Sequence, residues 1–234
     1  GVRESSAGYK DLGGLWKFAM TDHADQGYTG FQDPAYDDRS WALMPVPGLW
    51  ELNGYGDPLY LNIGYAWANQ YRSDPPVVPL INNHTGFYRH TFTVPQEWSG
   101  KQVFIHFGSV TSNLSLWING MFVGYSEDSK LEARFDITPY LQPGENRIAL
   151  KVFRWCDGTY LEDQDFWRLS GISRDVFLFA REKTHIHDFT LNASLENNYK
   201  SGNLQISVAL NRPAGQMRVQ AELLDPQGNS LGSK

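Results

Sequence analysis

The stretch Leu114–Tyr125 reads LSLWINGMFVGY and contains two runs in which apolar and polar residues alternate. Alternation with a period of two places the apolar side chains on one face of a β-strand. Asn119 and Gly120 join the two runs, and this dipeptide favours a tight hairpin because both residue types tolerate a positive φ. The stretch therefore predicts a β-hairpin with one buried face.

Similar alternation occurs on both sides of this hairpin, whereas no long window carries a sustained helical period. Strands are expected at Leu15–Met20, Phe87–Val94, Gln102–Phe107, Asn146–Trp155 and Ser173–Ala180. A helical turn is expected within residues 136–144, and the first 80 residues or so predict a largely irregular segment. Many short strands with turns between them favour an all-β sandwich, and a jelly roll is the preferred topology.

The composition changes near Arg181–Thr184, which marks a candidate domain boundary. Three alternating runs follow, at residues 186–195, 204–210 and 217–224. A turn is expected at Asp225–Gly228, with no strand after it. These runs supply about half of an immunoglobulin-like sandwich. We therefore predict an all-β chain in which residues 1–181 form a jelly-roll β-sandwich and residues 182–234 form part of an immunoglobulin-like β-sandwich.

Composition excludes several classes of protein. The net charge of −6 argues against a nucleic-acid-binding protein, which needs basic phosphate contacts. No apolar run is long enough for a membrane-spanning helix, and the single cysteine cannot form an internal disulfide. Eight tryptophans and 41% hydrophobic residues indicate a folded chain. Residues 1–10 lack the apolar core of a signal peptide, which leaves the compartment open between cytoplasm and periplasm.

The segment Arg154–Val176 reads RWCDGTYLEDQDFWRLSGISRDV and interleaves carboxylates with aromatic rings. Its acidic residues are Asp157, Glu162, Asp163 and Asp165. Such a mixture suits a surface that binds sugar hydroxyls or a hard cation, and it equally suits a solvated loop with buried rings. The residues alone leave both interpretations open. Motifs for nucleotide binding, zinc binding or a serine nucleophile are not found in the sequence.

This segment resembles the N-terminal domain of the β-galactosidases of glycoside hydrolase family 2. Further matches lie in order at Leu15–Phe18, Val46–Trp50, Pro58–Asn62, Trp117–Gly120 and Phe135–Ile137. The similarity covers nearly all of residues 10–190. It implies a jelly-roll sugar-binding domain, an immunoglobulin-like domain and a TIM barrel that carries both catalytic Glu residues. No catalytic residue is therefore expected in this chain.

The resemblance also implies roles for particular side chains. Asn62 matches a family Asn that contacts the galactosyl group, and Asp165 matches an Asp that binds a sodium ion beside the sugar's 6-hydroxyl. Glu127 and Asp157 stand where this branch can hold magnesium, with Glu127 in place of a Gln. The implied cofactors are thus sodium and magnesium. The implied partners are a β-galactoside substrate, the barrel of the same polypeptide and further copies in a homo-oligomer.

Three functions follow as hypotheses. In the first, which we prefer, the domain lends Asn62 and Asp165 to a retaining β-galactosidase site on a barrel outside this chain, so the chain alone should be inactive. In the second, the chain is a stand-alone carbohydrate-binding module that uses aromatic residues of the Tyr60–Tyr71 loop. In the third, it has a structural or oligomerisation role.

Overall fold

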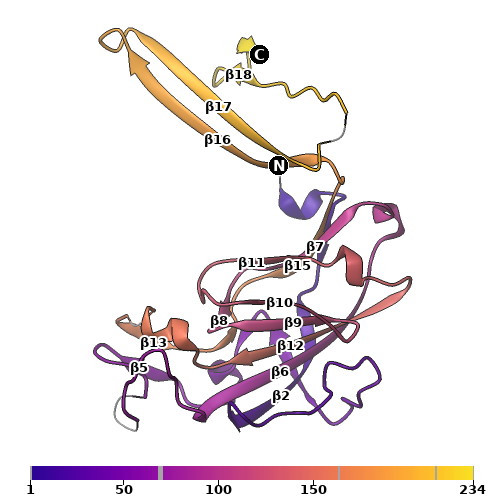
Figure 1. Cartoon of the computed structure of the whole chain (residues 1–234), viewed down its shortest axis with the longest axis vertical. Helices are drawn as coiled ribbons and strands as arrows, with labels where there is room; N and C mark the ends of the chain where they lie inside the picture. Colours follow the sequence, from indigo (N-terminus) through magenta and orange to yellow (C-terminus); the bar gives the residue numbers. More distant parts are fainter. Residues whose placement is uncertain (1, 68–70, 163, 214, 234) are drawn as a thin grey trace. The chain divides into compact units, whose positions relative to one another are not determined.

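The computed structural model describes residues 2–67, 71–162, 164–213 and 215–233. The chain divides into two compact units, Gly1–Ala180 and Arg181–Lys234. Strands dominate both units (Figure 1), and the prediction of an all-β chain is confirmed. The helical elements are single turns: η1 Arg3–Ser5, η2 Glu51–Asn53, η3 Gln96–Trp98, η4 Thr138–Tyr140 and η5 Asp157–Tyr160. None of the helices in the described residues has the length and apolar character needed to cross a membrane.

The first unit is a β-sandwich of antiparallel sheets. Its larger sheet has the strand order β10-β9-β12-β6-β2-β3, and the sheet that faces it has the order β1-β15-β7-β11. The bounds of the larger sheet are β2 Gly14–His23, β3 Ala42–Val46, β6 Ile81–Thr93, β9 Leu114–Ile118, β10 Met121–Ser126 and β12 Glu145–Phe153. Those of the facing sheet are β1 Tyr9–Asp11, β7 Gln102–Phe107, β11 Ala133–Asp136 and β15 Val176–Arg181. Short strands β4 Gly48–Leu49, β8 Val110–Thr111 and β14 Gly171–Ile172 form a further sheet.

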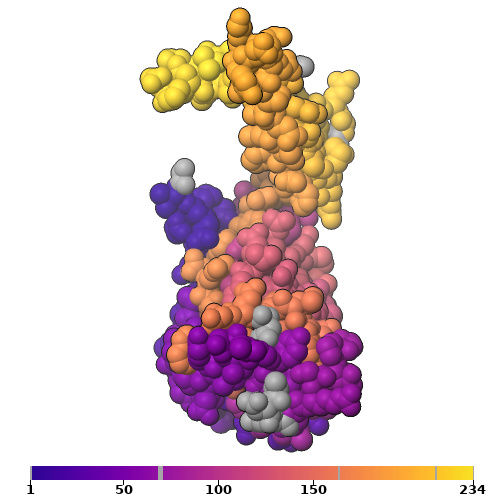
Figure 2. All heavy atoms as spheres, turned by 90° about the vertical axis from the view of Figure 1, so that its left-hand side faces the viewer, coloured from indigo at the N-terminus to yellow at the C-terminus, as the bar shows by residue number. Residues whose placement is uncertain are grey.

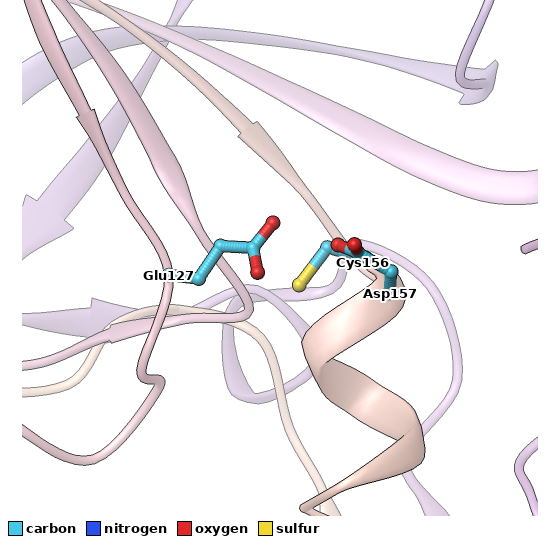
Figure 3. A group of neighbouring side chains, drawn as sticks. All are labelled: Glu127, Cys156 and Asp157. Atoms are coloured by element: carbon cyan, nitrogen blue, oxygen red, sulfur yellow. The ribbon is translucent and has the colours of Figure 1, made fainter. Parts of the chain in front are cut away.

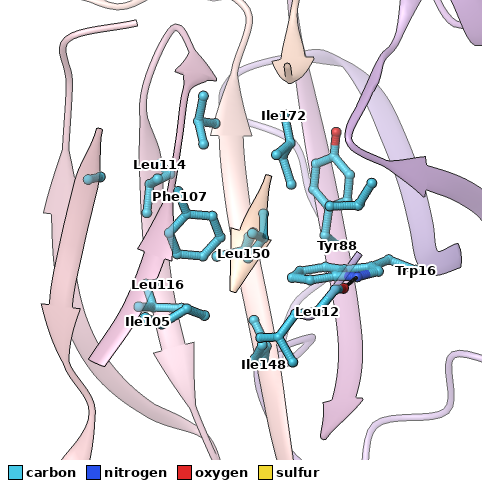
Figure 4. Packing of buried hydrophobic residues seen from close by; sticks show 14 of the residues in the cluster. Leu12, Trp16, Tyr88, Ile105, Phe107, Leu114, Leu116, Ile148, Leu150 and Ile172 are labelled. Atoms are coloured by element: carbon cyan, nitrogen blue, oxygen red, sulfur yellow. Dashed lines mark hydrogen bonds between the residues drawn. The ribbon is translucent and has the colours of Figure 1, made fainter. Parts of the chain in front are cut away.

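The core lies between these sheets and consists of alternate residues from each strand (Figure 4). Ile105 and Phe107 enter it from one side, and Leu116 and Leu150 enter it from the other. All four side chains are fully buried, so each contributes about 1.5–3 kcal/mol of hydrophobic stabilisation as an upper estimate. The period-two pattern in the sequence is therefore the pattern of core contacts.

The hairpin predicted at residues 114–125 is confirmed as β9 and β10. Asn119 and Gly120 have φ values of 51° and 82°, as the tight turn requires. The Asn119 amide also donates to the carbonyl oxygen of Tyr140 at 2.9 Å, and its oxygen accepts from the Arg147 amide at 2.8 Å. The turn residue thus connects the hairpin to η4 and β12.

The first 80 residues are more regular than the sequence predicts. β3 pairs with β2, and β5 (Leu59–Leu61) pairs with β13 (Phe166–Arg168). The strand expected from Phe87 also begins earlier, at Ile81. Pro45 and Asn82 interrupt the usual strand composition at these places, but pairing across the sheet overrides local propensity.

The second unit contains two antiparallel hairpins. β16 (His185–Glu196) pairs with β17 (Ser201–Asn211), and β18 (Glu222–Leu224) pairs with β19 (Ser230–Ser233). The expectation that no strand follows the turn at Asp225 is wrong. The Asp225 carboxylate accepts the backbone N–H groups of Gln227 and Asn229 at 2.9 and 2.7 Å, and this Asx turn directs the chain into β19. The run from Met217 forms a strand only at its end.

We expect Gly86→Ala to destabilise the first unit. A Cβ at this position in β6 would lie 2.3 Å from Cζ2 of Trp50, a fully buried ring whose Nε1 donates to the hydroxyl of Tyr88. Overpacking of this kind costs about 1–3 kcal/mol. Urea unfolding followed by tryptophan fluorescence measures the loss. Gly232→Ala is the matched control, because a Cβ there meets no atom within 4 Å, and equal effects of the two substitutions would contradict the packing argument.

Candidate functional site

The β5–β13 ribbon brings together the two side chains predicted to contact substrate. Its register pairs Leu61 with Phe166. Asn62 directly follows Leu61 and Asp165 directly precedes Phe166, so both lie at the same end of the ribbon. Both residues are exposed. Two segments that lie far apart in the sequence therefore present an amide and a carboxylate next to each other.

Two aromatic residues lie beside this pair: Tyr60, which begins the loop named in the carbohydrate-binding-module hypothesis, and Trp167, from the segment rich in carboxylates and rings. Tyr60 pairs with Trp167 in the ribbon, and their ring centroids are 5.5 Å apart. They are 51% and 55% exposed, which is unusual for rings of this size. The Tyr60 hydroxyl donates a hydrogen bond of 2.6 Å to Oδ1 of Asp165. Tyr60 and Trp167 lie inside the motifs quoted above, but their pairing becomes visible only in the fold.

Buried charges support the segments that flank the ribbon. The Glu51 carboxylate accepts the backbone N–H of Ser170 at 2.8 Å and lies 3.9 Å from the Arg154 guanidinium. Arg154 in turn donates to the carbonyl oxygen of Asp57 at 2.8 Å. Burial raises the pKa of Glu51 and lowers the pKa of Arg154, since both charges are removed from water. These contacts join the chain just before β5 to the chain just after β13.

The loop after β5 is less open than the carbohydrate-binding-module hypothesis requires. Trp67 is buried, with its ring centroid 5.1 Å from that of Tyr160 and 5.7 Å from that of Tyr65. A buried indole cannot serve as a stacking platform for a sugar. In Figure 2 the purple residues of the 50–80 segment adjoin the orange residues of the 155–170 segment on one surface. The exposed rings available there are those of Tyr60 and Trp167.

The predicted magnesium ligands also lie together, with Cys156 beside them (Figure 3). Glu127, Cys156 and Asp157 each offer a ligand atom, and these atoms lie within 4.8 Å of one another. Glu127 comes from the loop after β10, and the other two come from the start of η5. Cys156 is buried, whereas Asp157 is exposed. Of the other acids of the motif, Glu162 accepts the backbone N–H of Ser129 at 3.0 Å, and Asp163 lies outside the described residues.

The carboxylate of Asp157 lies close enough to that of Glu127 to affect its ionisation. Burial raises the pKa of Glu127, and the neighbouring Asp157 raises it further, although the Tyr125 hydroxyl donates to the Glu127 carboxylate. A cation between the two carboxylates would relieve their repulsion. Their oxygens suit magnesium, which prefers hard oxygen ligands, whereas the thiol of Cys156 does not. Burial raises the pKa of that thiol, which keeps it protonated.

The ribbon site has donors that suit sodium and a sugar. The carboxylate of Asp165 provides hard oxygens, and the amide of Asn62 both donates and accepts. These are few ligands for a complete cation site, since sodium and calcium-like ions take several oxygens. A cation bound at this site would need further ligands from substrate, water or another segment of protein.

Comparisons with known proteins place the chain in a family. A family model described as "Glycosyl hydrolases family 2, sugar binding domain" matches residues 9–182. A β-galactosidase of Priestia megaterium is 47% identical over 205 residues, which cover 88% of this chain and 20% of the relative. A β-galactosidase of Vibrio cholerae is 42% identical over 222 residues, which cover 95% and 21%. The chain thus spans about a fifth of the length of these relatives.

Solved structures agree on the fold. A β-glycosidase from Bacteroides vulgatus has a TM-score of 0.66 and 27% identity, covering 96% of this chain and 27% of that one. A β-glucuronidase from an uncultured Clostridium species has a TM-score of 0.72, covering 98% and 38%, at 22% identity. Together with the sandwich and the matched family model, these similarities show that the chain belongs to the glycoside hydrolase family 2 sugar-binding domains.

Proposed function

We propose that this chain is the sugar-binding region of a retaining β-galactosidase whose catalytic barrel belongs to the same polypeptide. The observation that carries the proposal is the register of β5 with β13, which puts Asn62 and Asp165 at one exposed end of the ribbon. The high identity to β-galactosidases and the short share of their length covered by this chain support it.

In this proposal the two side chains divide the work of holding the galactosyl group. The Asn62 amide donates to one hydroxyl oxygen and accepts from another hydroxyl. The Asp165 carboxylate holds a sodium ion, which neutralises its charge and ligates the 6-hydroxyl of the sugar. A retaining glycosidase also needs a nucleophile and an acid/base that flank the glycosidic bond. We place both on the barrel, and we place a structural magnesium ion between Glu127 and Asp157.

The chain by itself is expected not to hydrolyse an aryl β-galactoside, whereas the longer polypeptide should do so. Release of the coloured phenol by each protein, at equal concentration and with added sodium, is the measurement. Turnover by the purified chain would contradict the proposal. Glu127→Gln in the chain would then test the neighbouring carboxylates of Glu127 and Asp157 as its source.

Calorimetry distinguishes the proposed function from the carbohydrate-binding-module hypothesis. A half-site should bind galactose or lactose only weakly, because most of its contacts are missing, whereas a self-sufficient module binds in the sub-millimolar range. Trp167→Ala and Tyr199→Ala are matched substitutions of exposed rings in the two units. Sub-millimolar binding by the chain that is lost only with Trp167→Ala would favour the module.

A further inference from the structure

We propose that Tyr60 is a positioning residue for Asp165: its hydroxyl occupies Oδ1 of the carboxylate and so presents Oδ2 to the cation and the sugar. This inference deepens the proposed function and rests on it. Nothing in the resemblance assigns a role to Tyr60, and the inference depends on the geometry of the β5–β13 ribbon.

An exposed carboxylate at the end of a strand has no fixed direction of its own. Asp165 lies just outside β13 and is exposed, so its side chain is free to rotate unless a partner holds it. The hydrogen bond of 2.6 Å from Tyr60 provides that partner. Such a short bond to a charged acceptor is stronger than one between neutral groups. The carboxylate is thus oriented by a residue on the neighbouring strand.

Tyr60 can act in this way because its ring is itself fixed. It lies against Trp167, with ring centroids 5.5 Å apart and planes inclined at 56°. Trp167 is the cross-strand partner of Tyr60 and lies two residues after Asp165, on the same face of β13. The ring pair therefore sets the position of the hydroxyl, and the hydroxyl sets the carboxylate.

The bond also leaves one oxygen of the carboxylate for other ligands. A carboxylate can bind a cation through one oxygen or through both. With Oδ1 accepting from a hydroxyl, Oδ2 remains for a single-oxygen contact. A tyrosine phenol is neutral at neutral pH, so the Tyr60 hydroxyl keeps its proton and donates to the carboxylate.

The first test is spectroscopic and uses the 234-residue chain without sodium. Tyrosine is labelled with ¹³C at Cζ, and the Tyr60 resonance is identified by its loss in Tyr60→Phe. Asp165→Asn should shift this resonance, because the phenol then loses its carboxylate acceptor. A Tyr60 resonance that does not respond to Asp165→Asn would overturn the inference, because the hydrogen bond would then be absent.

The second test measures sodium. With the chain, sodium binding is followed by the line broadening of ²³Na. With the longer polypeptide, the measured quantity is the sodium concentration that gives half of the maximal activity. Both are measured at constant ionic strength. Tyr60→Phe keeps the ring contact with Trp167 but removes the hydroxyl that orients the carboxylate. Sodium binding should weaken about tenfold, as it does when a residue that orients a metal ligand is lost. At saturating sodium kcat should be retained. Tyr199→Phe, an exposed tyrosine of the second unit, is the control and should change nothing.

The failures of the two proposals are distinguishable. If Asp165→Asn abolishes the sodium response and Tyr60→Phe leaves it unchanged, the positioning role is wrong and the proposed function stands. If Asp165→Asn has no effect on sodium or galactoside, the proposed function itself fails and the positioning role fails with it. If the double variant is no worse than Asp165→Asn alone, Tyr60 acts through Asp165.

Discussion

Arg89→Met is expected to lower the free energy of unfolding of the first unit by about 3–5 kcal/mol, since it removes a buried cation that binds Asp38 and carbonyl groups of the neighbouring loop. The Arg89 guanidinium is 1% exposed in β6 and donates to the Asp38 carboxylate at 2.7 Å. It also donates to the carbonyl oxygens of Phe31 and Asp33 in the loop between β2 and β3. Methionine fills a similar volume but satisfies none of these acceptors.

Urea unfolding monitored by tryptophan fluorescence gives the change in midpoint. Arg39→Met is the matched control in the same loop. The Arg39 guanidinium lies 2.6 Å from the Asp37 carboxylate, about as close as Arg89 lies to Asp38, but Arg39 is 88% exposed. An exposed pair is screened by water, so its loss should leave the midpoint unchanged. Arg89→Lys keeps the charge with fewer donors and should fall between wild type and Arg89→Met. Equal midpoints for Arg89→Met and Arg39→Met would refute the structural role of the buried pair.

Asp165→Ala is expected to lower kcat/KM of the longer polypeptide on an aryl β-galactoside by about 10²-fold, the usual scale for loss of one well-placed polar contact. Its dependence on sodium should disappear at the same time, because the cation loses its carboxylate. The chain should remain folded, since Asp165 is exposed and its hydrogen bond is to Tyr60 of the same ribbon. The measurement is a series of initial rates at several sodium concentrations.

Asp188→Ala serves as the control for a lost surface charge. Asp188 is exposed in β16 of the second unit, remote in sequence from the β5–β13 ribbon. Its removal should leave both kcat/KM and the sodium response unchanged. Full sodium-dependent activity in Asp165→Ala would instead favour the structural or oligomerisation role.

The sequence was sufficient to predict elements whose stability is local or strictly periodic. The hairpin at Asn119–Gly120 is one example, since its turn chemistry and its buried face agree. The sheet partners of the first 80 residues were not predictable, because β5 is short and is stabilised by pairing with β13 rather than by its own composition. The strand after Asp225 was missed for a related reason: an Asx turn depends on side-chain to backbone bonds that composition does not reveal.

The candidate site could also be predicted only in part. A resemblance identified Asn62 and Asp165, but it could not say that one ribbon holds them side by side. Composition gave no signal for Tyr60 either, because most aromatic residues in a sandwich belong to the core. Only its exposure and the hydrogen bond to Asp165 distinguish it from the buried rings.

The pairing of β5 with β13 also sets limits on which insertions and deletions this protein can tolerate. Successive side chains of a strand point to opposite faces, so a one-residue change within Phe166–Arg168 would turn Asp165 away from Tyr60. A two-residue change would restore the face but displace the carboxylate along the strand. Length variation among functional relatives should therefore be confined to the loops beyond the ribbon, while the ribbon itself keeps a constant length in both strands.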